Sequence, residues 1–248
     1  PKEETIGDYY KSENYVSHSG TKKGLINTLY HLVRSRAIKQ KERLASKYSG
    51  TKQILDIGCG AGRHAAAMAM AGHHVTGVDL SANSILSAKQ SYGGMADSLR
   101  FVEGDMRYID AQFAPQCFDV VTMMFTSFGY FNTEEEHLQT LRAIHAVLRP
   151  KGTFILDFLN LEKVRAELNQ HEHIVREGIE FEIHRRLTEE WIEKSIAFTD
   201  SSGERQHYTE RVRAFSLQKL QSLLKACGFE IDAVFGNYDL IPLGKNSP

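Results

Sequence analysis

A glycine-rich turn after an apolar run constrains this chain more than any other feature. Residues 54–64 read Ile-Leu-Asp-Ile-Gly-Cys-Gly-Ala-Gly-Arg-His, and an alanine-rich stretch, 65–71, follows. The pattern predicts a buried strand, a tight turn and the first turn of a helix. Glycine is needed because the backbone bends sharply and a ligand must approach without meeting a Cβ atom. The segment therefore predicts the first strand–helix unit of a ligand-binding α/β sheet.

Two details of this turn narrow the ligand. The spacing is G-x-G-x-G, whereas dinucleotide enzymes carry G-x-G-x-x-G. Asp56 lies inside the strand, where its carboxylate would repel a pyrophosphate and would suit a positive group such as the ammonium of an amino acid. Both details disfavour a dinucleotide oxidoreductase.

Two further strands also end in carboxylates. Asp79 ends the apolar segment 75–80, at a distance from the glycines that suits a bond to ribose. Asp105 follows the strand at Phe101, where it can accept from an exocyclic amine while Met106 covers a purine. Three acids at three strand ends thus address an amino acid, a ribose and an adenine. S-adenosylmethionine (SAM) carries all three parts.

These segments resemble the motifs of the class I SAM-dependent methyltransferases. LDIGCGAG (55–62) resembles the first motif of that family, VTGVDLS (75–81) its acidic second-strand motif and VEGDMRYI (102–109) its adenine motif. The resemblance covers residues 50–160 well and 216–236 more loosely. It implies a Rossmann-like, mostly parallel, doubly wound sheet with SAM as cofactor. The cofactor-binding residues that it implies are Asp56, Gly58, Cys59, Gly60, Asp79, Leu80, Ser81, Asp105, Met106 and Met124.

Composition limits the partners, the cellular compartment and the kinds of site that we expect for this chain. The 248 residues carry a formal net charge of -1, which argues against a surface that coats nucleic acid or membrane. Three cysteines without C-x-x-C spacing indicate a reducing compartment and neither a disulfide framework nor a zinc site. No apolar run reaches the length of a membrane span, and no signal-peptide pattern opens the sequence. We expect a cytoplasmic enzyme without a metal.

The chain divides into four expected parts. Residues 1–50 form an N-terminal helical segment and lid, with a basic helix over 22–47; residues 51–160 form the SAM-binding core. Residues 161–214 break the strand–helix rhythm and predict an antiparallel β insert after the fifth strand, acting as a substrate lid. Its expected elements are a short helix, 161–168, and strands over 179–187, 191–199 and 205–213.

The last part, 215–248, is expected to complete the core. Ser216 caps a predicted helix, 217–226, and Gly228 closes it. A strand over 229–235 would then return to the sheet. A seventh strand is doubtful, because Pro242 removes a donor from the ladder.

Candidates on the substrate side are fewer. The segment 124–131, Met-Phe-Thr-Ser-Phe-Gly-Tyr-Phe, lacks the [DNS]-P-P-[YF] motif of amino-methylating base and glutamine enzymes and the Pro-Cys nucleophile of cytosine C5 enzymes. These exclusions favour a small-molecule substrate. The candidate substrate-side residues are Tyr10, with Tyr9 beside it, Tyr130, Asp157, Arg211 and Arg213. For Asp157 a loop anchor is an equal alternative, and for the two arginines a solvent-exposed position is the alternative to binding an anionic group.

The leading hypothesis is a SAM-dependent methyltransferase acting on an oxygen or nitrogen atom of a small metabolite. An RNA methyltransferase, supported only by the basic helix over 22–47, and a SAM- or nucleoside-binding module without turnover remain alternatives. The sequence leaves open the substrate, the accepting atom and the oligomeric state.

Overall fold

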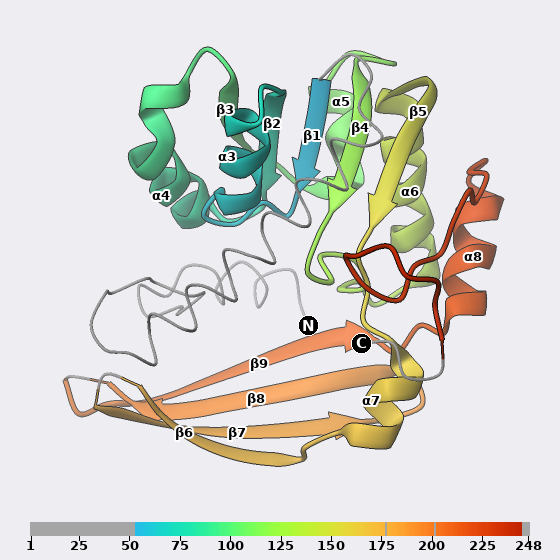
Figure 1. Ribbon diagram of the computed structural model, residues 1–248. Coiled ribbons are helices and arrows are strands. Elements are labelled where there is room, and N and C mark those ends of the chain that lie inside the picture. The colour runs from blue at the N-terminus through green and yellow to red at the C-terminus, as the bar shows by residue number, and fades with distance from the viewer. Residues whose placement is uncertain (1–52, 177, 201, 245–248) are drawn as a thin grey trace.

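The computed structural model describes residues 53–176, 178–200 and 202–244, which form two sheets and their covering helices (Figure 1). The expected N-terminal lid, its helix over 22–47 and the two tyrosines Tyr9 and Tyr10 lie outside the described residues. Strands and helices alternate up to the fifth strand, in the order β1 (Gln53–Ile57), α3 (Arg63–Met70), β2 (His74–Asp79), α4 (Ala82–Tyr92), β3 (Leu99–Glu103), α5 (Ile109–Gln112), β4 (Phe118–Met123), α6 (Glu134–Val147) and β5 (Leu148–Leu156). The 3-10 turns Gly93–Met95 and Met106–Tyr108 flank β3.

The first sheet is wholly parallel, in the order β3-β2-β1-β4-β5. The order reverses between β1 and β4, and the loops after these two strands open at the same edge of the sheet. Ligands of open α/β sheets bind at such a switch point. The predicted Rossmann-like class is confirmed.

Both faces of this sheet are covered. Helices α3 and α4 pack on one face, against Ile54 and Val120, while α6 and α8 (Leu217–Ala226) pack on the other, against Leu55 and Val121. Neighbouring residues of one strand thus point to opposite cores, as buried parallel strands require. Ser216 caps α8 as predicted, Ser81 caps α4 in the same way, and Thr133 forms a capping box with Glu136 on α6.

Strand β5 begins earlier than its sequence predicts. The residues Arg149-Pro150-Lys151-Gly152 predict a turn before a strand over 153–158, but β5 already pairs with β4 at Leu148. The register then shifts, so that Val120 faces Thr153 and the four residues bulge, with Lys151 at φ 65°. A bulge absorbs the turn residues without ending the pairing.

The insert forms a separate four-stranded antiparallel sheet in the order β6-β7-β8-β9, below the first sheet in Figure 1. Helix α7 (Leu161–Glu167) leads into β6 (His171–Arg176), and the bounds of β7 (Ile179–Leu187), β8 (Trp191–Thr199) and β9 (Arg205–Arg213) are those predicted. Strand β6 was missed, because its two apolar residues, Ile174 and Val175, are adjacent and give no alternating pattern. Cross-strand ion pairs such as Arg186–Glu193 and Lys194–Glu210 stabilise the sheet.

The predicted sixth strand is wrong. No strand lies over 229–235 in the described part of the chain, and β5 is the edge of its sheet. Phe229 instead packs on Phe154 and His145, and its amide donates to the carbonyl of Leu224 as part of the α8 cap. Farther on the tail turns back on itself, with one bridge between Phe235 and Pro242. The doubt about a seventh strand was therefore correct over the residues described here.

Of the helices in the described ranges, none combines the length and the apolar character that a membrane crossing requires.

The glycine turn yields a stability prediction. Gly62, at φ +80°, precedes α3, and a Cβ there would lie 2.4 Å from Cζ of Phe101; at Gly60, with φ +53°, a Cβ would have no heavy atom within 4 Å. We expect Gly62→Ala to lower the free energy of unfolding by roughly 2–5 kcal/mol, because left-handed strain and overpacking add. Gly60→Ala should lose only about 1–2 kcal/mol. Equal losses in denaturant unfolding would contradict the packing role of Gly62.

Candidate functional site

The loops after β1 and β4 touch at the switch point. Gly58, at φ +69°, leaves no room for a side chain, because a Cβ atom would lie 2.7 Å from Oγ of Ser127. Ser127 belongs to the β4–α6 loop (residues 124–133), and its hydroxyl donates to the carbonyl of Met124 at 2.6 Å. The predicted glycine thus allows the close approach of two loops.

Asp79 fixes the glycine turn against β2. Its Oδ2 accepts from the amide of Gly60 at 2.7 Å, and its Oδ1 accepts from the amide of Ser81 at 2.9 Å. The side chain is only 8% exposed. Burial raises the pKa of this carboxyl, and the two amide bonds offset part of that rise.

A first cavity of about 150 Å³ opens beside this turn. Its walls come from the ends of β1, β2 and β3 and from the β4–α6 loop, and they include the predicted residues Gly58, Asp79, Leu80, Asp105, Met106 and Tyr130. Residues predicted from three separate motifs therefore line one space. Ser81 lies behind it as the cap of α4.

Three predicted cofactor residues are packed away from these walls in the structure. Cys59 and Met124 belong to the core cluster beneath α3 and α4, and burial raises the pKa of the Cys59 thiol well above its ordinary value. Asp56 is almost fully buried within β1 and accepts a hydrogen bond from Thr122 Oγ1 at 2.8 Å. Their contacts with a cofactor remain predictions.

Arg107 is a wall residue that the motifs did not reveal. Its guanidinium donates to both carboxylate oxygens of Asp105, at 2.6–3.1 Å, and to Glu136 Oε1 at 2.9 Å. It also lies 5.0 Å from the ring centroid of Phe131. A bidentate contact of this kind fixes the direction of the carboxylate that the sequence assigns to adenine. The sequence gives no local signal of the contact with Glu136, because the two residues are far apart in the chain.

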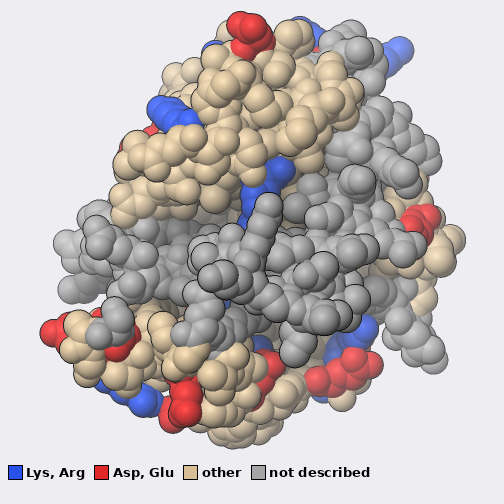
Figure 2. Space-filling view, turned by 60° about the vertical axis from the view of Figure 1, so that its left-hand side comes forward, with Lys and Arg blue, Asp and Glu red and all other residues tan. Residues whose placement is uncertain are grey.

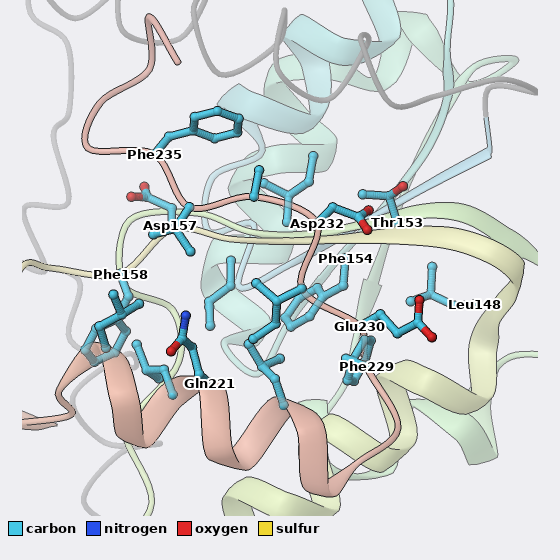
Figure 3. A pocket seen from close by; sticks show the side chains of 18 of the residues that line it. Leu148, Thr153, Phe154, Asp157, Phe158, Gln221, Phe229, Glu230, Asp232 and Phe235 are labelled. Carbon is cyan, nitrogen blue, oxygen red and sulfur yellow. The ribbon is translucent and has the colours of Figure 1, made fainter. Parts of the chain in front are cut away.

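A second and larger cavity, of about 1210 Å³, runs along the free edge of β5 and is called the β5 cavity below (Figure 3). Its other walls are α8 and the segment 228–238. Phe125 and Thr126 of the β4–α6 loop close the end near the carboxyl terminus of β5. The same loop therefore borders both cavities, with Ser127 and Tyr130 on the first and Phe125 and Thr126 on the second.

Asp157 lines the β5 cavity and anchors that loop. Its Oδ2 accepts from the amide of Phe125 at 2.8 Å and from the hydroxyl of Tyr238 at 2.5 Å, while its carbonyl accepts from the amide of Thr126 at 3.0 Å. Phe125 and Thr126 have φ values of 55° and 56°, which are strained for residues with side chains. Of the two predicted alternatives for Asp157, the anchor is confirmed by these bonds, and the substrate role stays a prediction.

Arg211 and Arg213 tie the insert to the same loop. Arg211 Nη2 donates to Asn132 Oδ1 at 2.7 Å, and Arg213 contacts the carbonyl of Asn132 and, at 2.7 Å, Glu190. Both guanidinium groups lie over the ring of Trp191, at 3.9 and 4.2 Å from its centroid. Neither arginine is among the described walls of the two cavities. Their predicted contact with an anionic substrate is still a prediction, whereas their contact with the loop is observed.

Comparisons with known proteins agree with this geometry. A family model described as a methyltransferase domain matches residues 54–152. YqeM of Bacillus subtilis (strain 168), which is named as a methyltransferase, is 28% identical over 196 residues, 75% of this chain and 76% of that protein. The glycine/sarcosine N-methyltransferase of Aphanothece halophytica is 30% identical over 127 residues, 51% of this chain and 48% of the relative.

A solved structure supports the fold over nearly the whole chain. The S-adenosylmethionine-dependent methyltransferase from Clostridium acetobutylicum ATCC 824 has a TM-score of 0.74 at 16% identity, covering 90% of this chain and 96% of the other. The matched segment 54–152 contains β1 to β4 and every motif residue that lines the first cavity. Residues 54–152 therefore match a methyltransferase domain, and the fold of the chain is that of a SAM-dependent methyltransferase.

Proposed function

We propose that this enzyme transfers a methyl group from SAM to a nitrogen or oxygen atom of a small molecule. The observation that carries the proposal is the β4–α6 loop, which borders the first cavity with Ser127 and Tyr130 and the β5 cavity with Phe125 and Thr126. A cofactor in the first cavity and an acceptor in the β5 cavity would lie on opposite sides of this loop and would meet where the loop separates the two cavities. The nitrogen-methylating relative named above supports the small-molecule class.

We assign the first cavity to the adenosine half of SAM. The open position at Gly60 leaves room beside the turn for a ligand, and Asp79 presents buried carboxylate oxygens next to it. We assign Asp79 to the ribose, and Asp105, oriented by Arg107, to the adenine amine, with Met106 against the base. Bound SAM supplies a methyl group that positive sulfur already activates, so the protein chiefly aligns the acceptor and excludes water.

We assign to the insert, and to the loop that it contacts, the role of aligning the acceptor with the methyl group of SAM. Backbone and side-chain contacts join β9 to the loop: the amide of Arg213 donates to the carbonyl of Gly129 at 2.8 Å, and Arg211 bonds Asn132. A sheet fixed in this way shields the carboxyl ends of the strands, as a lid must. We therefore retain the lid role for residues 161–214 as part of the proposal.

The surface of the described residues supports an RNA substrate less than it supports a small-molecule substrate. On the face in Figure 2, the acidic and basic side chains of the described residues are interspersed and form no continuous basic patch. The helix over 22–47 that favoured this alternative lies outside the described residues. Retention on RNA that falls steeply with added salt would favour the alternative over a small-molecule substrate.

Cofactor binding tests the assignment of Asp79. We expect Asp79→Ala to weaken SAM binding by about 1.5–3 kcal/mol, because a charge-assisted hydrogen bond to the ribose is lost. Asp97→Ala, which removes an exposed acid outside the first cavity, is the matched control and should leave affinity unchanged. Titration calorimetry is the measurement, and tighter binding of NAD than of SAM by the unaltered protein would contradict the proposal.

The buried carboxyl also predicts a pH dependence of stability. The pKa of Asp79 is raised above its ordinary value of 3.8, so the folded protein favours the protonated form. Its contribution to the free energy of unfolding is therefore largest below that ordinary value and is lost as pH rises through the raised pKa. We expect the difference in stability between the unaltered protein and Asp79→Ala to fall as the pH rises above about 4 in denaturant titrations. A difference that grows with pH would instead indicate a lowered pKa.

A further inference from the structure

The end of the β5 cavity that adjoins the β4–α6 loop combines one polar pair with several aromatic rings. Asp157 lies at the same end as Phe158 and Phe235 in Figure 3, and Tyr238 bonds its Oδ2 at 2.5 Å. Phe125, 61% exposed, adds an accessible ring from the loop. A carboxylate among aromatic faces is an environment that attracts an organic cation, through charge pairing and through the ring quadrupoles.

The basic side chains along this cavity are separated from the Asp157 carboxylate, while Glu230 and Asp232 lie toward Leu148 and Thr153 (Figure 3). Of its described wall residues, the lysine, arginine and histidine members are Lys151, Arg149 and His145, and none of them belongs to the loop end. Lys151 and Asp157 are six residues apart, or roughly 20 Å along a strand. Arg149 is moreover paired with Asp119 at 2.5 Å. The basic side chains of the described walls thus gather toward the start of β5, and the Asp157 carboxylate lies beyond its far end.

The Tyr238 hydroxyl preserves that negative charge. Burial, together with the adjacent Asp157 carboxylate, raises the pKa of Tyr238 above its ordinary value, so the phenol stays protonated and donates to Asp157. The phenolic oxygen keeps its acceptor lone pairs. The pair thus presents a single negative charge and acceptor oxygens from two residues.

We propose that the loop end of the β5 cavity is the acceptor site, and that it binds a primary or secondary amine carried on an apolar or aromatic body, with Asp157 and Tyr238 receiving the ammonium. This inference rests on the proposed function and specifies its substrate class. The ammonium loses one proton before its nitrogen can accept a methyl group, and a carboxylate oxygen of Asp157 lies at the site to take that proton.

A binding experiment separates the amine from its neutral and anionic counterparts. The probes are 2-phenylethylamine, 2-phenylethanol and 3-phenylpropionate, which share a ring and differ in the terminal group. Titration calorimetry on the full chain, saturated with the demethylated product of SAM, should show binding of the amine at least about tenfold tighter than that of the alcohol. Tighter binding of the carboxylate, or no binding of the amine, would overturn the proposal.

Tyr238→Phe is the decisive variant, because it removes one hydroxyl and keeps the ring. We expect amine affinity to fall about tenfold or more while affinity for the demethylated cofactor is unchanged. Tyr92→Phe, at the end of α4 beside Phe101, is the matched control and should behave as the unaltered protein. Asp157→Asn should abolish amine binding, but it also removes a loop anchor, so its thermal midpoint must be compared. Unchanged amine affinity in Tyr238→Phe refutes the site.

Single-turnover transfer from SAM to a mixture of the three probes, read by mass spectrometry, distinguishes the two levels of inference. Methylated amine that is lost in Tyr238→Phe supports both. Methylation of the alcohol or the acid alone leaves the transferase proposal standing and overturns the amine site. Amine binding that depends on Tyr238, without transfer to any probe, supports the site and counts against the proposed reaction.

Discussion

The backbone of Phe125 and Thr126, held in the left-handed region by Asp157, is the constraint on which both cavities depend. Two non-glycine residues in succession at positive φ cost about 1–3 kcal/mol each, so they persist only when other contacts fix them. Asp157 supplies two of those contacts, one from its side chain and one from its carbonyl. The turn sends the loop on to Ser127, which meets Gly58, and so divides the edge of the sheet into two spaces.

The core could be predicted from the sequence because its signals are local. A glycine turn, a serine cap and the capping box of Thr133 with Glu136 each depend on residues within four positions of one another. Apolar runs of five or six residues then place the parallel strands between them. The prediction of a strand over 229–235 was wrong for the converse reason. The alternation of these residues fits a half-buried strand, but Phe229 instead contacts the α8 cap and Phe154. No local pattern in the sequence indicates these contacts.

The sequence predicted which strand ends form the site, but it did not predict the side-chain contacts within the site. The motifs correctly placed Asp79 and Asp105 beside one space, since the carboxyl ends of parallel strands meet at one edge. They could not give the direction of each side chain, and Cys59 and Met124, which are predicted to contact the cofactor, lie in the core cluster. Nor could they pair Arg107 with Glu136, or Asp157 with Tyr238, which are 29 and 81 residues apart.

The arginines of the insert show how charge can position a wall instead of binding a ligand. Both guanidinium groups stack on Trp191 and bond to Asn132 or Glu190, while the buried Nε of Arg211 has no hydrogen-bond partner among the described residues. Breaking these side-chain contacts to bind an anion would leave the backbone bond between Arg213 and Gly129 as the link described between β9 and the β4–α6 loop. Because that loop borders both cavities, an anion held by Arg211 and Arg213 would disturb the geometry that transfer requires. The insert is therefore suited to holding the β4–α6 loop in place, and in the amine-site proposal the charge that selects the acceptor comes from Asp157 at the sheet edge.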